Sequence, residues 1–156
     1  MSRRLVSLLG ILVVIGCMFC LTGCLSKEAL TGAEFTEKME AAGYTVTDIT
    51  ANYDSTYVKA VLIAKDPTDN YQIEFFEQNS VDQAQVSYET NIETMHENQG
   101  STATHFSVNG ANYQKETQSS NGQYWVVCQV DNTFIYVNVS DTYKADIDKA
   151  LETLGY

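Results

Sequence analysis

Arginine is nearly absent from this chain of 156 residues, which carries only Arg3 and Arg4. Beyond them, seven lysines stand against 20 acidic residues, a formal charge of −13. Bidentate capture of phosphates usually relies on guanidinium groups, and nucleic-acid binding needs a positive surface that displaces counterions. We therefore expect no nucleic acid or nucleotide among the ligands of this protein.

Cysteine and proline are also scarce. Cys128 is the only cysteine beyond Cys24, so an internal disulfide is not expected if Cys24 is modified. A single cysteine in an apolar strand usually behaves as a small buried hydrophobic residue, and we expect this of Cys128. The only proline is Pro67, and the apolar segments alternate regularly, as is typical of a globular chain rather than a disordered one.

Histidine occurs only twice, at His96 and His105. Their spacing matches neither a catalytic triad nor a structural zinc motif, although Glu93 and Glu97 lie beside the first of them. No Gly-x-Ser-x-Gly elbow is present. The segment 66–70 clusters oxygen ligands but lacks the glycine and terminal glutamate of a calcium loop, so we expect a turn there. The sequence therefore predicts no catalytic residue, no metal site and no cofactor.

The longest apolar run lies at the start of the chain. Two arginines precede the almost unbroken apolar segment Leu5–Phe19, an arrangement typical of a secretion signal. The run ends in Leu21-Thr22-Gly23-Cys24, which resembles the lipobox of bacterial lipoproteins. The resemblance implies cleavage between Gly23 and Cys24 and a diacylglyceryl group on the Cys24 thiol. It also implies a lipid anchor in the cell membrane, with the protein on the extracytoplasmic face.

Two alternatives to this anchor remain open. A second lipobox-like stretch, Val14–Cys17, would leave a much shorter apolar region before the cleavage point. An uncleaved membrane anchor is also conceivable, because Leu5–Leu21 reaches the lower end of the roughly 17–25 residues needed to span a bilayer. We favour Cys24, because it uses the whole apolar run as the signal.

This assignment divides the chain into three parts. Residues 1–23 form the signal peptide, residues 24–30 the lipidated cysteine with a short tether, and residues 31–156 a single globular domain. At roughly 3.3–3.6 Å per residue, such a tether reaches about 20 Å. We therefore expect the domain, and a protein partner, close to the membrane.

Capping boxes and apolar periodicity predict three helices, separated by two groups of strands. The helices run from the box Thr31-x-x-Glu34 to Gly43, from the box Ser80-x-x-Gln83 to about Gly100, and from about Asp141 to Gly155. Strands are expected at 45–50, 57–64, 71–77, 104–108, 111–118, 123–130 and 133–139. Asn-Gly and Asp-Asn pairs between the later strands favour tight hairpins and antiparallel pairing.

The predicted fold class is α+β, with an antiparallel sheet of about six to seven strands and three helices packed on it, in the order α-βββ-α-ββββ-α. The segments 35–44, FTEKMEAAGY, and 147–156, IDKALETLGY, show a weak internal similarity. It suggests a duplicated unit, although amphipathic helices that end in glycine resemble one another in any case.

Aromatic side chains gather on the last strands. The stretch 124–130 is apolar on both faces, which predicts a central strand buried on both sides. On 133–139, alternate apolar residues would face the helices and leave the aromatic residues on the other face, unless the second helix or a loop covers that face as well. The candidate binding face, completed from neighbouring strands, comprises Tyr113, Tyr124, Phe134, Tyr136 and Asn138.

We expect a non-catalytic, membrane-anchored module that binds a protein near the membrane. The alternative is a lipoprotein that binds a small ligand or a glycan or peptide of the cell envelope. A small hydrolase or a protease inhibitor is less favoured.

Overall fold

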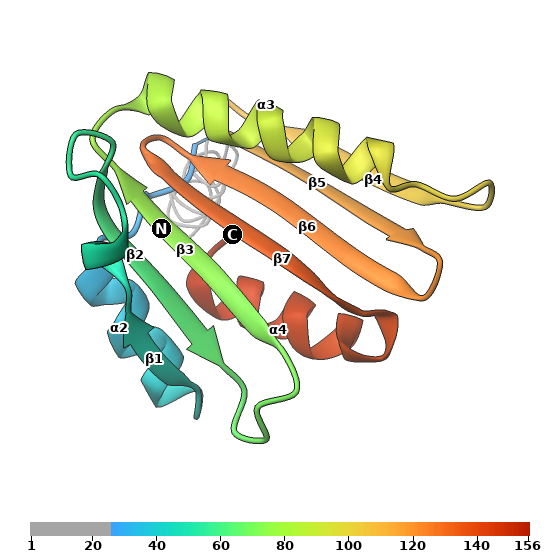
Figure 1. Ribbon diagram of the computed structural model, residues 1–156, viewed down its shortest axis with the longest axis horizontal. Helices are drawn as coiled ribbons and strands as arrows, with labels where there is room; N and C mark the ends of the chain where they lie inside the picture. The colour runs from blue at the N-terminus through green and yellow to red at the C-terminus, as the bar shows by residue number, and fades with distance from the viewer. Residues whose placement is uncertain (1–25) are drawn as a thin grey trace, which may run out of the picture.

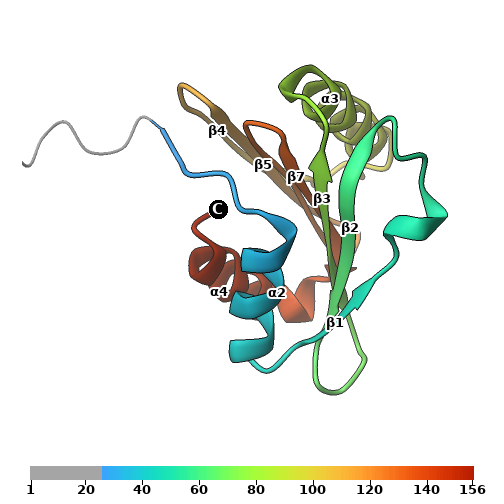
Figure 2. The ribbon, with the colours of Figure 1, turned by 90° about the vertical axis from the view of Figure 1, so that its left-hand side faces the viewer.

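The computed structural model describes residues 26–156, so the predictions for the signal peptide, Gly23 and Cys24 lie outside the described residues. These residues form three layers, in which one sheet separates two helices on one face from a single helix on the other (Figures 1 and 2). Within this part of the chain, no helix combines the length and the apolar character needed to cross a bilayer.

The sheet has seven strands in the order β1-β2-β3-β7-β6-β5-β4, and every neighbouring pair is antiparallel. The strands are β1 (Thr45–Asp48), β2 (Val58–Lys65), β3 (Gln72–Gln78), β4 (Thr104–Asn109), β5 (Tyr113–Ser120), β6 (Gln123–Val130) and β7 (Thr133–Ser140). Strands β1–β3 and β4–β7 each follow one another in space as in sequence. The two groups meet where β3 pairs with β7.

Tight turns fix the register of the second group. Asn121 and Gly122 have φ values of 53° and 73°, and they connect β5 to β6 directly. Two consecutive positive φ angles are typical of the two-residue hairpin turn that matches the twist of the strands. The expected Asn109-Gly110 turn is not a two-residue turn. Asn109 ends β4, and a connection of three residues, 110–112, leads to β5 at Tyr113.

The helices begin where the sequence predicts. In α2 (Gly32–Ala41), Thr31 accepts a hydrogen bond from the backbone N–H of Glu34, and Glu34 accepts one from Thr31 at 2.8 Å. In α3 (Val81–Glu97), Ser80 caps Gln83, but the Gln83 side chain donates to Thr56 O instead of completing the box. The third helix, α4 (Lys144–Leu154), follows the 3-10 turn η2 (Asp141–Tyr143).

Helices α2 and α4 cover one sheet face and enclose the main core. Phe35 of α2 stacks on Phe75 of β3 with ring centroids 4.5 Å apart, and Leu151 of α4 is fully buried with them. Cys128 of β6 is also fully buried here, and burial raises the pKa of its thiol to about 12. A smaller core lies under α3 on the other face, so β6 is buried on both sides as predicted.

The α+β class, the seven-stranded antiparallel sheet and the three helices are confirmed. Two local features differ from the expectation. Strand β1 ends at Asp48, where the short 3-10 helix η1 (Thr50–Asn52) turns the chain toward β2. The expected tether also contacts the domain. The side chain of Asn112 accepts a hydrogen bond from the backbone N–H of Lys27 at 2.9 Å and donates one to the backbone oxygen of Lys27 at 2.7 Å. Leu30 is buried in the main core.

Candidate functional site

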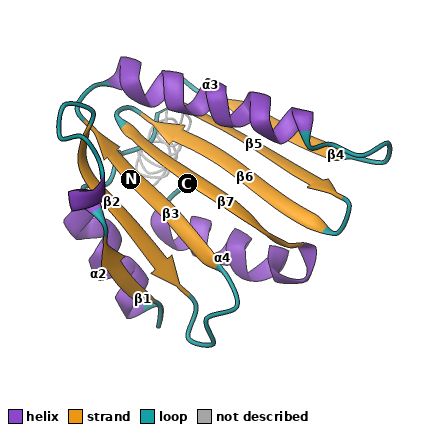
Figure 3. Ribbon diagram, viewed as in Figure 1, coloured by secondary structure: helices purple, strands orange, loops and turns teal. Residues whose placement is uncertain are grey.

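Helix α3 covers only part of its sheet face. It packs on β6, β7 and the end of β3, and it leaves β1, β2 and most of β3 uncovered on that side (Figures 1 and 3). We call this uncovered region, with the adjoining parts of β7, the open face. No helix covers this region, because α2 and α4 lie on the other side of the sheet (Figure 2).

A row of aromatic rings runs along the boundary between the open face and α3. The Tyr53 ring meets Phe76 edge-on with centroids 5.9 Å apart, and Phe76 lies 5.6 Å from Phe134. Further along, Tyr136 meets Trp125 edge-on at 6.1 Å. Such edge-to-face and tilted contacts are favourable geometries for aromatic pairs. Their combined surface offers an apolar contact area that the domain itself does not fully bury.

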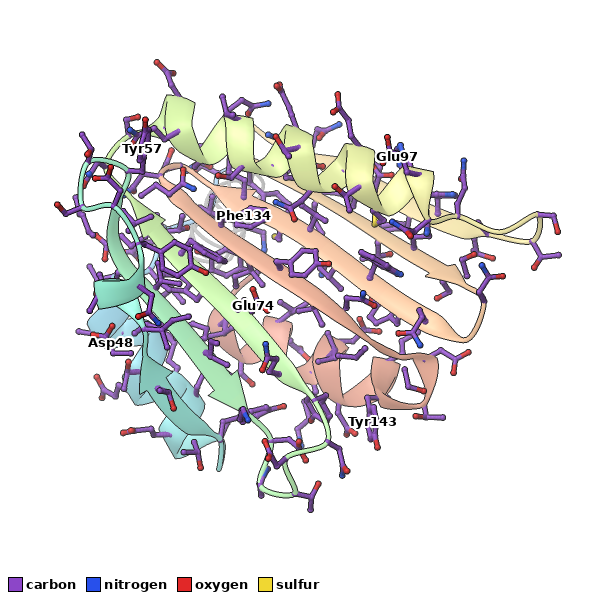
Figure 4. All side chains as sticks on the ribbon, in the orientation of Figure 1. Asp48, Tyr57, Glu74, Glu97, Phe134 and Tyr143 are labelled. Carbon is purple, nitrogen blue, oxygen red and sulfur yellow. The ribbon has the colours of Figure 1, made fainter. Side chains whose placement is uncertain are left out.

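Between η1 and α3 this row opens into a groove with a volume of about 480 Å³. We name it the aromatic groove, and its apolar lining comprises Tyr53, Tyr57, Val58, Phe76, Val86 and Phe134. Tyr57 is 59% exposed and Val86 62% exposed, which is unusual for large apolar side chains. Figure 4 places Tyr57 beside the start of α3 and Phe134 on β7, near that helix. The groove is therefore largely apolar and open, and its lining comes from β2, β3, β7, α3 and the segment before β2.

Two amide oxygens in the groove have no hydrogen-bond partner within the described chain. Gln78 donates its side-chain N–H to Ser87 Oγ at 2.5 Å, yet its buried Oε1 accepts nothing. Gln83 donates to Thr56 O at 3.2 Å, and its Oε1 is likewise unpaired. A buried carbonyl oxygen without a donor has a free-energy cost of roughly 1–3 kcal/mol. Both residues line the aromatic groove, so unpaired amide oxygens lie buried beside its apolar surface.

A more polar hollow of about 540 Å³ lies further along the open face. Glu74 and Tyr136 line it from neighbouring strands, and Asn138 and Lys65 stand at its rim. Burial raises the pKa of Tyr136, and the nearby Glu74 carboxylate raises it further. The Tyr136 hydroxyl therefore remains neutral at physiological pH and can donate a hydrogen bond.

The structure brings together three of the five residues predicted for the binding face. Phe134, Tyr136 and Asn138 alternate along β7 on the side of α3. The expected placement of Tyr113 and Tyr124 beside them is wrong. Both pack on the main core, on the other sheet face.

The register explains this correction. Tyr113 lies opposite Val130, and Tyr124 lies opposite Val139, and both valines belong to the main core. Directly paired residues share a sheet face, so the two tyrosines point toward α4. There the Tyr124 hydroxyl donates to Asp148 Oδ1 at 2.6 Å.

The sequence reasoning missed Tyr53, Tyr57 and Phe76. Tyr53 lies in an irregular segment between β1 and β2, where periodicity carries no information. Tyr57 was expected to begin the strand 57–64, but it lies just before β2, which begins at Val58. Phe76 belongs to a correctly predicted strand, but its closeness to Phe134 depends on the pairing of β3 with β7. The only sequence feature that could have indicated this groove is that these three aromatic residues occur within or near strands β2 and β3.

The two histidines lie outside the aromatic groove. His96 and His105 have ring centroids 5.4 Å apart at the C-terminal end of α3. The carboxylate beside them is Glu116 of β5, rather than the expected neighbours Glu93 or Glu97. The sequence spacing predicted no metal site at these histidines, and the structure places both of them in one cluster with Glu116.

Comparisons with protein-family models, with curated proteins and with solved structures found no match for this chain. The geometry of the open face is therefore the basis for a functional proposal.

Proposed function

We propose that this chain is a bacterial lipoprotein, anchored by a lipid on Cys24 at the extracytoplasmic face of the cell membrane, that binds a protein partner without catalysing a reaction. The lipobox and the short link between Cys24 and the domain support the anchor. The aromatic groove supports the binding role, and it is the observation that carries the proposal. A partner segment with an apolar side chain would fill the groove, with its polar groups beside Gln78 and Gln83 at the lining.

The position of the aromatic groove favours a partner at the membrane. Lys27, three residues after Cys24, is bonded to Asn112 just before β5 begins. Val58 at the start of β2, Gln78 at the end of β3 and the first turn of α3 lie at that same end of the strands. The groove therefore opens at the end of the sheet nearest to the proposed lipid, although on the other face from α2 and α4 (Figure 2).

Position-specific crosslinking in cells tests this proposal. A photoreactive amino acid at Tyr57, which lines the groove, is expected to capture one membrane protein in roughly stoichiometric amount. The same amino acid at Glu152, an exposed residue of α4 on the other face of the sheet, is the control and is expected to capture much less. Equal capture from both positions, or none from Tyr57, would contradict the proposal.

A glycan or peptide of the cell envelope is the second candidate ligand. The polar hollow around Tyr136 and Asn138 favours it, because a tyrosine ring next to amide groups can both stack and hydrogen-bond. Thermal unfolding in the presence of muropeptides or sugars distinguishes the candidates. A saturable rise in Tm that Tyr136→Ala abolishes would favour the small ligand over the protein partner.

The internal duplication also stays a prediction. A two-fold relation across the antiparallel pair β3 and β7 would place the helices that follow these strands on one face. In the structure, α3 follows β3 on one face and α4 follows β7 on the other (Figure 2). This arrangement favours independent amphipathic helices that share a glycine ending.

A further inference from the structure

Both histidines of the chain meet in one cluster with a carboxylate. His96 lies in the last turn of α3, His105 on the edge strand β4 and Glu116 on β5. His96 Nε2 contacts Glu116 Oε1, and His105 Nδ1 lies 3.6 Å from the same oxygen. One nitrogen from each ring and one carboxylate oxygen all lie within 4.8 Å of one another. The three groups thus converge on one point from three elements.

Sheet register and a short connection produce this convergence. Ser107 pairs with Glu116 and His105 with Gln118, so His105 and Glu116 are diagonal neighbours on one face of the β4–β5 pair. The chain folds back directly after α3, where the Gly100 N–H donates to Ser120 Oγ at 2.7 Å. The last turn of α3 is thereby held over β5, which brings His96 to the other two groups.

The hydrogen bonding of His105 indicates which nitrogen is free. Gln99 Oε1 lies 3.0 Å from His105 Nε2, and an amide oxygen can only accept, so this nitrogen carries the proton. In the neutral ring, Nδ1 then directs a lone pair toward the Glu116 carboxylate. Two electron-rich atoms that face each other favour a cation between them. Metal-binding histidines usually have this arrangement, in which the remote N–H donates to an oxygen that orients the ring.

The surroundings also favour positive charge. Among residues 26–156, Glu116 contacts the two histidines but no lysine forms an ion pair with it. The C-terminal end of a helix carries partial negative charge, and His96 lies at that end of α3. The net charge of the whole chain is −11.

We propose that His96, His105 and Glu116 bind one Zn²⁺ ion in a three-ligand site. Two imidazoles and a carboxylate are a ligand set typical of zinc, and a fourth position remains for water or for a group from a partner. Zinc bonds of about 2.0–2.2 Å in a tetrahedral site place the ligand atoms roughly 3.3–3.6 Å apart. The direct contact between His96 and Glu116 must therefore open to admit the ion, whereas His105 Nδ1 already lies 3.6 Å from the Glu116 oxygen. The side chains allow this movement, because His96 is 44% exposed and His105 34% exposed.

The bound ion would hold the edge of the sheet to α3. All six residues of β4 are exposed, and this strand pairs only with β5. The zinc site lies at the C-terminal end of α3, near Glu97, whereas Tyr57 and the aromatic groove lie at the N-terminal end (Figure 4). The two sites are therefore separate, and the zinc proposal does not depend on the proposed function.

Titration of the chelator-treated full-length protein with Zn²⁺ in mild detergent tests the proposal. Calorimetry is expected to show one saturable site, and Tm is expected to rise with Zn²⁺ and to fall back with chelator. Each of the variants His96→Asn, His105→Asn and Glu116→Gln should weaken binding at least tenfold. Gln99→Ala should weaken it about tenfold by freeing the His105 ring. Glu97→Gln makes the same change of charge next to His96 and should leave the affinity unchanged.

Cysteines near the start of the chain could bind zinc on their own, so Co²⁺ is titrated in parallel. A cobalt spectrum without thiolate charge-transfer bands supports the histidine site. The proposal is overturned if the wild-type protein shows no saturable binding at millimolar Zn²⁺, or if binding survives in the His96→Asn/His105→Asn double variant. The circular dichroism of each variant, measured in chelator and compared with that of the wild type, separates lost ligands from lost folding.

Discussion

The rings of Phe76 and Phe134 lie directly opposite each other across the strand pair that joins the two halves of the sheet, with centroids 5.6 Å apart. Phe134 is almost completely buried under α3, whereas Phe76 is only partly buried. The two residues form the floor of the aromatic groove at the place where the covered and open parts of the sheet face meet. The floor of the groove is thus a product of long-range strand pairing.

Val86→Asp should separate binding from stability. Val86 is 62% exposed, so the free energy of unfolding is expected to change by no more than about 0.5 kcal/mol. A charge at this position would require desolvation inside an apolar contact, so crosslinking of the partner through Tyr57 should fall at least tenfold. Glu152→Ala, on the exposed surface of α4 at the other sheet face, is the control. A variant with unchanged partner capture would show that the partner does not occupy the groove.

Asp66 is expected to stabilise the loop between β2 and β3. Its carboxylate accepts hydrogen bonds from the backbone N–H groups of Asn70 and Tyr71, at 2.6 and 2.9 Å, and from Thr68. Asp66→Ala should lower the free energy of unfolding by about 1–3 kcal/mol, because these donors lose their acceptor. Urea denaturation at pH 7 measures this, with the exposed Asp82→Ala as the control.

The same carboxylate predicts a pH dependence. Burial alone would raise the pKa of Asp66, but the hydrogen bonds from Thr68, Tyr71 and Asn70 outweigh it and hold the pKa below its ordinary value. A depressed pKa means that the unfolded state takes up the proton first as the pH falls. The contribution of Asp66 is therefore complete above about pH 4–5 and lost as the pH falls through its folded pKa. The Asp66→Ala variant should lose less stability than the wild type over that range.

Tyr156, the last residue, should contribute to stability through its ring more than through its hydroxyl. The ring is buried in the main core, and the hydroxyl hydrogen-bonds Thr133 of β7. Tyr156→Ala is expected to cost about 3 kcal/mol, as for other buried aromatic residues. Tyr156→Phe should cost only about 1 kcal/mol, because the Thr133 hydroxyl still donates to Val130 O at 2.7 Å. Equal losses in the two variants, measured by urea denaturation, would contradict this division.

Cys128 should resist alkylation in the folded protein. Only the thiolate reacts, and burial raises the pKa of this thiol to about 12, so almost none is ionised at pH 8. After treatment with iodoacetamide, mass spectrometry should find the peptide that contains Cys128 unmodified in buffer and modified in urea. Rapid modification under native conditions would show that β6 opens readily.

Local signals predicted the secondary structure because their physical causes are local. The capping residues Thr31 and Ser80 begin helices through bonds to residues three positions away, and Asn121-Gly122 turns the chain by its own backbone preference. The burial of β6 on both faces followed from its unbroken apolar composition. Such features need no knowledge of distant parts of the chain.

The candidate sites depend on distant contacts, which the sequence pattern does not encode. Nothing near Phe76 specifies that β3 pairs with β7 rather than with another strand, so the aromatic groove could not be predicted. The position of Glu116 beside His96 and His105 depends on a diagonal relation between β4 and β5 and on the tight connection after α3. Tyr113 and Tyr124 were assigned to the wrong face because the alignment of their strands with β7 was unknown. A shift of one residue along a strand moves every side chain to the other face of the sheet.

The two hydrogen bonds between Asn112 and the backbone of Lys27 affect how the protein would approach other molecules at the membrane. In the sequence, only Leu25 and Ser26 separate Cys24 from Lys27, where these hydrogen bonds are made. With Cys24 acylated as proposed, the domain would have little freedom to swing or tumble on its anchor and would present one edge of the sheet to the bilayer surface. A partner in the same leaflet would then approach by lateral diffusion in two dimensions, with both molecules already oriented. Lengthening the link between Ser26 and Lys27 with glycine and serine should weaken this association while leaving every contact surface intact.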